Sequence, residues 1–142
     1  MPSFRPSINA DDGYFKKVVK YIPAEIIAAY TFAIGIINAK ACNGEYVFLF
    51  PWVFYILLAF TPIYMYISVI DNPSIIDPIK KKKQALFHAI IACIAFALWV
   101  YALGDLPMVC YIGEVAYKAV VGSLLLAAFS LLVPLLERLF LK

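Results

Sequence analysis

Residues 46–70 read YVFLFPWVFYILLAFTPIYMYISVI and contain no charged side chain. An α-helix rises 1.5 Å per residue, so about 20 apolar residues cross a hydrocarbon layer about 30 Å thick. This stretch of 25 residues is long enough for one crossing and too short for two. It therefore predicts one transmembrane helix.

Three other stretches have the same character. Residues 84–104 and 119–136 contain no charged side chain, and residues 21–39 contain one, Glu25. We expect an all-α integral membrane protein, a four-transmembrane-helix bundle that forms one transmembrane domain over residues 1–142. The predicted spans are 21–39, 46–70, 84–104 and 117–136.

The composition agrees with this prediction. The chain is 65% hydrophobic and 15% charged, with a mean hydropathy of +0.89, whereas a soluble domain is about half apolar and a quarter charged. A net charge of +3 is too small for the basic surface that nucleic acids require. We therefore expect lipid and protein partners and no nucleic acid.

A polar leader, residues 1–20, precedes the first predicted span. Asp11 and Asp12 can cap a short helix whose apolar side chains gather on one side and whose lysines gather on the other, a pattern that suits a membrane surface. The span that follows has no small-residue cleavage site, so we expect it to be retained. The leader is predicted to be an interfacial helix on the inner leaflet.

The basic residues are distributed unevenly between the two sides of the membrane. Ten fall on the side of the termini and the middle loop, namely Arg5, Lys16, Lys17, Lys20, Lys80, Lys81, Lys82, Lys83, Arg138 and Lys142. Only Lys40 and Lys118 fall on the other side, where the outer loops are predicted at 40–45 and 105–115. Cytoplasmic loops are enriched in Lys and Arg, so we expect both termini to be cytoplasmic, in a bacterial inner membrane.

Small residues spaced by four predict where helices meet in lipid. Two such ridges, predicted to touch each other, are Ala85, Ala89, Cys93 and Ala97 in the third span and Ala119, Ser123 and Ala127 in the fourth. A third stripe runs along the first span through Ala24, Ala28, Thr31, Gly35 and Asn38. We expect this stripe to be a packing face too.

Glu25, Thr31, Asn38 and His88 form a candidate polar site within the membrane. Glu25 has two interpretations: it complements the positive end of its helix just after Pro23, or it marks an ion or substrate path. His88 lies at a similar predicted depth, where it can pair with Glu25 or bond to lipid phosphate at the interface.

Cys42 and Cys110 fall in the two outer loops, so an oxidising compartment would allow a disulfide between them, although spacing alone cannot establish its geometry. Cys93 is expected to fill space in its helix.

The run Lys80–Lys83 precedes the third span. Near an anionic leaflet each of these charges contributes about 1 kcal/mol to membrane attachment. The run is therefore predicted to bind anionic lipid headgroups, and a docking site for a partner protein is the alternative interpretation.

No residue pattern indicates a reaction. There is one His, no C-x-x-C, no Ser/His/Asp set, no glycine-rich phosphate loop and no metal-binding motif. We expect a protein that is not an enzyme and has no cofactor, metal site or catalytic residue. The leading hypothesis is a structural, assembly or anchor subunit that associates with itself or with a larger complex. An oligomeric pore lined by the first-span stripe, with Glu25 at its mouth, is the alternative.

A third hypothesis is a small proton-coupled exporter. The sequence resembles the small multidrug resistance family in its four predicted helices, in Glu25 of the first helix and in Trp99 within FALWVYALG, residues 96–104. The resemblance implies proton-coupled export. Those transporters are shorter, carry their acid deeper in the membrane and have little charge bias, so no family is assigned.

Overall fold

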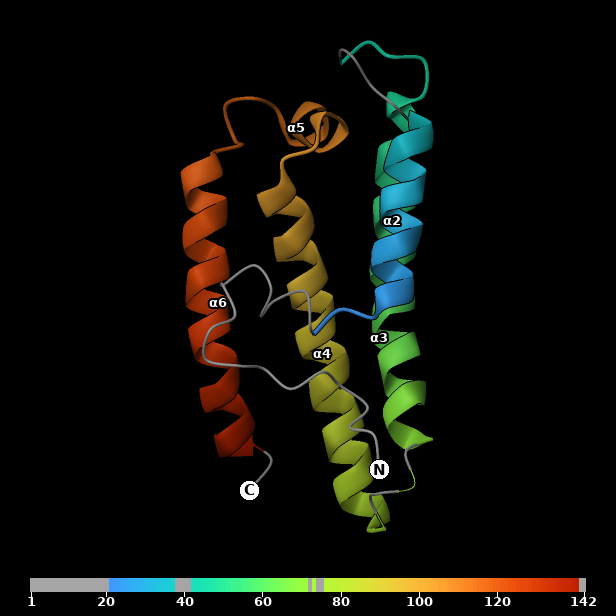
Figure 1. The fold of residues 1–142 in the computed structure, drawn as a ribbon, viewed down its shortest axis with the longest axis vertical. Coiled ribbons are helices and arrows are strands. Elements are labelled where there is room, and N and C mark those ends of the chain that lie inside the picture. The colour runs from blue at the N-terminus through green and yellow to red at the C-terminus, as the bar shows by residue number, and fades with distance from the viewer. Residues whose placement is uncertain (1–20, 38–41, 72, 74–75, 141–142) are drawn as a thin grey trace.

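The computed structural model describes residues 21–37, 42–71, 73 and 76–140, and these residues form helices and no strands (Figure 1). The helices are α2 (Ala24–Ile37), η1 (Val47–Leu49), α3 (Phe50–Ile70), α4 (Pro78–Leu103), α5 (Leu106–Ile112) and α6 (Ala119–Phe140). Three segments of the described chain are long and apolar enough to cross a membrane: Val47–Ile70, Pro78–Leu103 and Ala119–Phe140. The chain has the fold of an all-α membrane protein.

α4 begins earlier than predicted. The Asp77 carboxylate accepts a hydrogen bond from the Ile79 backbone N–H (3.0 Å), and Pro78 occupies the first turn, where its missing N–H costs nothing. The tetralysine run, expected in the loop before the span, therefore lies inside the helix. Hydropathy shows where the charged residues end, whereas the capping residue Asp77 determines where the helix begins. At its other end, α4 stops at Gly104, which adopts φ 61°.

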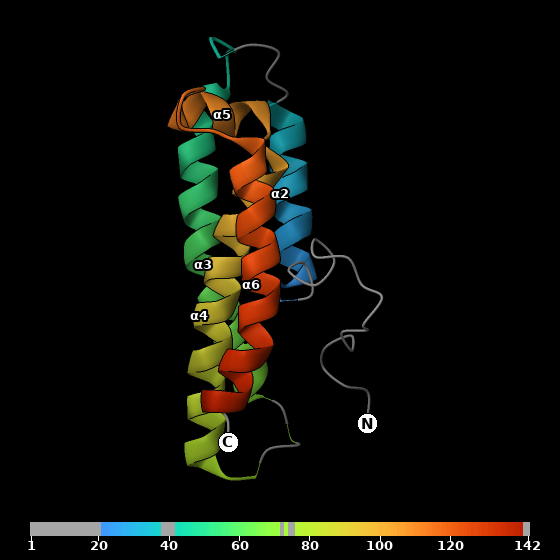
Figure 2. The same cartoon turned by 90° about the vertical axis from the view of Figure 1, so that its left-hand side faces the viewer.

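α4 is the central helix. It lies between α3 and α6, and α2 lies beside α3 (Figures 1 and 2). Its buried residues face both neighbours and are Ala85, Ala89, Ile91, Ala92, Ala95, Phe96, Trp99 and Val100. Because α4 has neighbours on several sides, both its small and its aromatic residues are enclosed.

Aromatic rings fill the half of the bundle next to α5. Tyr30 of α2 meets the rings of Phe96 and Trp99 edge-on, with centroid distances of 5.9 and 5.4 Å. Phe54 of α3 stacks on Phe96 from the other side (6.0 Å), and Phe50 stacks on Phe54 (6.1 Å). Such ring pairs add about 0.5–1.5 kcal/mol each beyond the area that they bury. This cluster attaches α2 to the bundle.

The first predicted span is shorter than expected. α2 has 14 residues, about 21 Å of helix, and no other described helix covers residues 21–39. Immediately before α2, Tyr21 lies edge-on against Phe129, halfway along α6, with 6.4 Å between the ring centroids. α2 therefore starts beside the middle of the bundle and runs toward the end that carries α5 (Figure 1). The predicted interfacial helix at 1–20 lies outside the described residues.

The packing of α4 differs from the prediction. Ala89 and Ala92 of α4 enclose Met65 of α3, and the Cys93 thiol donates to the Leu58 carbonyl oxygen of α3 (3.9 Å). The small ridge of α4 thus faces α3, and the predicted seam between this ridge and α6 is wrong.

α6 approaches α4 through a different face from the predicted one. Ala119 and Ser123 are exposed. The buried residues are Gly122, Leu126, Phe129, Ser130 and Val133. A Cβ added at Gly122 would lie 3.1 Å from the Cα of Ala102, so the absence of a side chain at Gly122 sets the close approach.

The predicted outer loop at 105–115 contains a short helix, α5, which lies across the end of the bundle (Figure 2). Pro107 falls in its first turn, and Gly113 ends it with φ 86°. Its Tyr111 ring packs against Phe50 of α3 (5.9 Å). The signal for this helix was Pro107 following Asp105, since both residue types favour a helix start.

Candidate functional site

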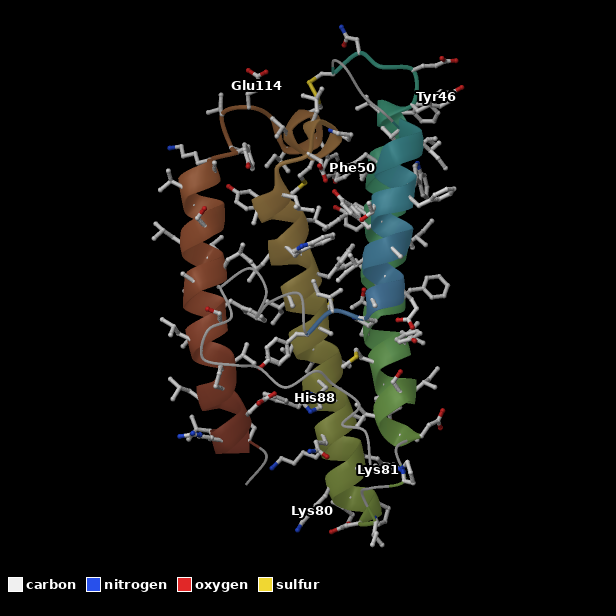
Figure 3. All side chains as sticks on the ribbon, in the orientation of Figure 1. Tyr46, Phe50, Lys80, Lys81, His88 and Glu114 are labelled. Atoms are coloured by element: carbon white, nitrogen blue, oxygen red, sulfur yellow. A yellow bond between two sulfur atoms is a disulfide. The ribbon has the colours of Figure 1, made fainter. Side chains whose placement is uncertain are left out.

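The two ends of the bundle differ in charge. Figure 3 shows Lys80 and Lys81 at one end and Tyr46 and Glu114 at the other. Of the six Lys and Arg residues that the structure describes, five belong to the first turns of α4 or the last turn of α6, and Lys118 lies at the opposite end. Successive helical residues differ by about 100° around the axis, so the four lysines surround α4 rather than form one face.

Glu25 lies deeper than the sequence indicated. It is exposed, in the first turn of α2, and it lies beside the Tyr64 side chain of α3. Tyr64 is 14 residues after Phe50 and 6 residues before Ile70, which places it about 21 Å and about 9 Å along the axis from the two ends of α3. Glu25 was expected one turn inside the inner boundary, and this contact places it nearly two turns inside.

The small residues of α2 face away from the bundle. We call Ala24, Ala28, Thr31 and Gly35 the α2 stripe, and all four are exposed. The Thr31 hydroxyl donates to the Ile27 carbonyl of its own helix (2.8 Å), and a Cβ added at Gly35 would meet no atom within 4 Å. Asn38, predicted to continue the stripe, lies outside the described residues.

The opposite face of α2 holds it against the bundle. Its buried residues are Ile26, Tyr30 and Ile37. The α2 stripe is therefore not used for packing within one subunit, in contrast to the small residues of α4.

His88 is half-buried on α4, just on the lysine side of the helix midpoint (Figure 3). Its ring lies edge-on against Phe87, with 5.6 Å between the ring centroids. The structure places Tyr64 of α3 beside Glu25. The pairing of His88 with Glu25 stays a prediction.

Cys42 and Cys110, considered above as a possible pair, are joined by a disulfide in the structure, with Cα atoms 5.3 Å apart and a sequence separation of 68. The bond ties the segment before η1 to α5. Cys93 is free and half-buried on α4.

Two polar contacts near α5 were missed by sequence reasoning. The Tyr30 hydroxyl, on a side chain only 1% exposed, donates to the Asp105 carboxylate (3.0 Å). Tyr55 of α3 and Tyr111 of α5 share a hydrogen bond (2.9 Å), which raises the pKa of Tyr111. Tyr30 shares the apolar face of Ile26 and Ile37, and a phenol on such a face was the available signal, since a buried tyrosine hydroxyl usually has a partner.

The described residues include no cluster of three His, Cys, Asp or Glu side chains placed to hold a metal ion. No family model matches the chain, and neither a curated protein nor a solved structure matches it.

Proposed function

We propose that this protein is a non-enzymatic assembly or anchor subunit of a membrane complex, and that it associates first with a second copy of itself through the α2 stripe. The observation that carries this proposal is the outward face of the stripe. Lipid offers little hydrophobic drive between helices, so contact faces are built from small residues that let two backbones approach closely. Here such a face is exposed on the subunit surface.

Symmetry favours a second copy as the occupant. A two-fold axis brings the same surface of two subunits together, and the small side chains of the α2 stripe allow it to pack against its own copy. Thr31 adds a hydroxyl to this face, and its bond to Ile27 satisfies its hydrogen without a partner helix. Dimer formation therefore leaves no buried donor unpaired at this position.

We further propose the membrane arrangement. Residues 21–39 are a fourth membrane segment, supported by the burial of Tyr21 and Ile22 just before α2. Both termini and the lysine end of α4 face the cytoplasm of a bacterial cell, at its inner membrane. The uneven charge of the two bundle ends supports this orientation, and Lys80–Lys83 bind anionic lipid headgroups there.

The test is oligomer size in mild detergent, measured by light scattering after size-exclusion chromatography. Gly35→Leu and Ala28→Leu place bulk on the stripe, and a side chain at position 35 meets no atom of its own subunit. The matched control is Ala128→Leu, at an exposed position of α6. We expect an oligomeric wild type and control, and monomeric stripe variants. A monomeric wild type, or equal effects of all three substitutions, would contradict the proposal.

An oligomeric pore is the second candidate, favoured by the same outward stripe, because subunits arranged around an axis would turn Thr31 and Gly35 toward a shared path. Single-channel recording in a planar bilayer separates the two proposals. A conductance that Gly35→Leu abolishes while the assembly keeps its size would favour the pore.

A further inference from the structure

The end of the bundle that carries α5 exposes a group of aromatic side chains. Each of them leaves between 45% and 69% of its surface accessible, and they are Tyr46, Phe48, Trp52, Tyr55 and Tyr111. We call these residues the aromatic face. A surface patch of large rings is uncommon on a protein that meets only water, and it marks a site of interaction.

α3 and α5 build this face together. Trp52 and Tyr55 are three residues apart and therefore lie on the same side of α3. Tyr111 of α5 meets the Tyr55 ring edge-on, with 6.4 Å between the centroids, and the two hydroxyls share a hydrogen bond of 2.9 Å. Tyr46 lies at the same end of the molecule (Figure 3). The disulfide between Cys42 and Cys110 links the two parts of the chain that carry these rings.

The character of the α3 surface changes with distance from this end. The exposed side chains of residues 56–63 are all hydrocarbon, namely Ile56, Ala59, Phe60 and Ile63. The next exposed rings with a polar atom, Tyr64 and Tyr66, belong to the opposite half of the helix. Tyr46 immediately precedes the segment Val47–Ile70, which is long and apolar enough to cross a membrane. The aromatic face therefore lies where a bilayer would change from headgroups to hydrocarbon.

The polar atoms of the aromatic face suit a partner that supplies acceptors. The Trp52 indole N–H can only donate. In the Tyr55–Tyr111 pair one hydroxyl donates to the other, which keeps its own hydrogen for an outside acceptor. Phospholipids offer ester carbonyl and phosphate oxygens as acceptors, and their acyl chains receive the apolar part of each ring.

We propose that the aromatic face binds the phospholipid interface of the leaflet at the α5 end, with Trp52 at the level of the ester carbonyls, and that it fixes the depth of the bundle in that leaflet. The proposal rests on one part of the proposed function, the crossing of a membrane by the long helices. It uses no residue of the α2 stripe and holds with or without self-association.

Tryptophan fluorescence of the full chain in phosphatidylcholine vesicles tests the depth of this face. The acyl chains carry bromine, a contact quencher, either near the ester end or near the methyl end. The chain has two tryptophans, and Trp99 is buried, so Trp52→Phe identifies the emission of Trp52 without disturbing the core. Bromine near the ester end should quench the Trp52 emission at least about twofold more than bromine near the methyl end.

The matched control moves the indole along the same helix. Trp52→Phe combined with Phe60→Trp places it at another exposed position of α3, about 12 Å deeper, where bromine near the methyl end should quench more strongly. Trp52 emission that iodide in water quenches and neither lipid does would overturn the proposal in favour of a face open to a protein partner. Stronger quenching of Trp52 by methyl-end bromine would overturn it too. If neither lipid quenches the indole at position 60, the membrane arrangement of the proposed function fails and the lipid surface fails with it.

Discussion

α2 and α4 carry the same kind of residue pattern and use it differently. In α4 the small residues are enclosed: Ala85 and Ala92 have no exposed surface, and Met65 of α3 packs against Ala89 and Ala92. In α2 the small residues at the same spacing are exposed. The pattern therefore predicts that a face makes close contacts, whereas the position of the helix in the bundle decides whether the contact lies within the subunit or between subunits.

The largest expected difference concerns two glycines, one at the contact between α6 and α4 and one on the α2 stripe. Gly122 of α6 lies against α4, where a Cβ would come within 3.1 Å of Ala102, and Gly35 of α2 has open space. Gly122→Leu should overpack the α4–α6 contact and lower the free energy of unfolding by about 1–3 kcal/mol. Thermal unfolding of the detergent-solubilised monomer measures this effect.

Gly35→Leu is the matched substitution. It should leave the midpoint temperature of monomer unfolding unchanged or slightly raised, since a Cβ at this position meets no atom within 4 Å. A loss of stability equal to that of Gly122→Leu would mean that the α2 stripe packs within the subunit.

A substitution on the buried face of α2 should have a smaller effect on stability. Tyr30→Phe keeps the ring contacts with Phe96 and Trp99 and removes only the hydrogen bond to Asp105. The expected loss is about 1–2 kcal/mol of unfolding free energy, because the acceptor is a carboxylate. Tyr55→Phe removes an exposed hydrogen bond and should cost less in the same thermal assay. The reverse order would show that α2 is not anchored through Tyr30.

The smallest expected effect is a gain in stability. Gly35→Ala fills open space and removes the conformational freedom of glycine in a helix, so the monomer should become about 0.5–1 kcal/mol more stable. Helical content by circular dichroism and the unfolding midpoint together measure it. A loss of stability would mean that the backbone at Gly35 is closely approached in the monomer.

The three long helices could be predicted because each contains a long charge-free run. The start of α4 could not be located by hydropathy, since Lys80–Lys83 lie inside a helix that Asp77 caps. The short α5 was not predicted, because its seven residues are too few for apolar periodicity to be informative. Asp105 and Pro107 nevertheless supplied a local signal for a helix start.

The candidate site was only partly predictable. The sequence identified Glu25 and the α2 stripe. The depth of Glu25 and its neighbour Tyr64 depend on how α2 lies against α3, which no spacing within one helix encodes. The α6 seam was missed because Ala119 and Ser123 matched the expected spacing, whereas Gly122, with no side chain, sets the contact. Both of these errors concern a relation between helices.

Disulfide cross-linking in native membranes tests the central claim, self-association through the α2 stripe, most directly. Thr31 and Ser123 are matched positions: both are exposed, and both hydroxyls donate to the carbonyl four residues earlier in their own helix. In a Cys93→Ala background, Thr31→Cys should form a covalent dimer on mild oxidation, and Ser123→Cys should stay monomeric. Equal cross-linking of the two variants, or dimers of Ser123→Cys alone, would contradict the account.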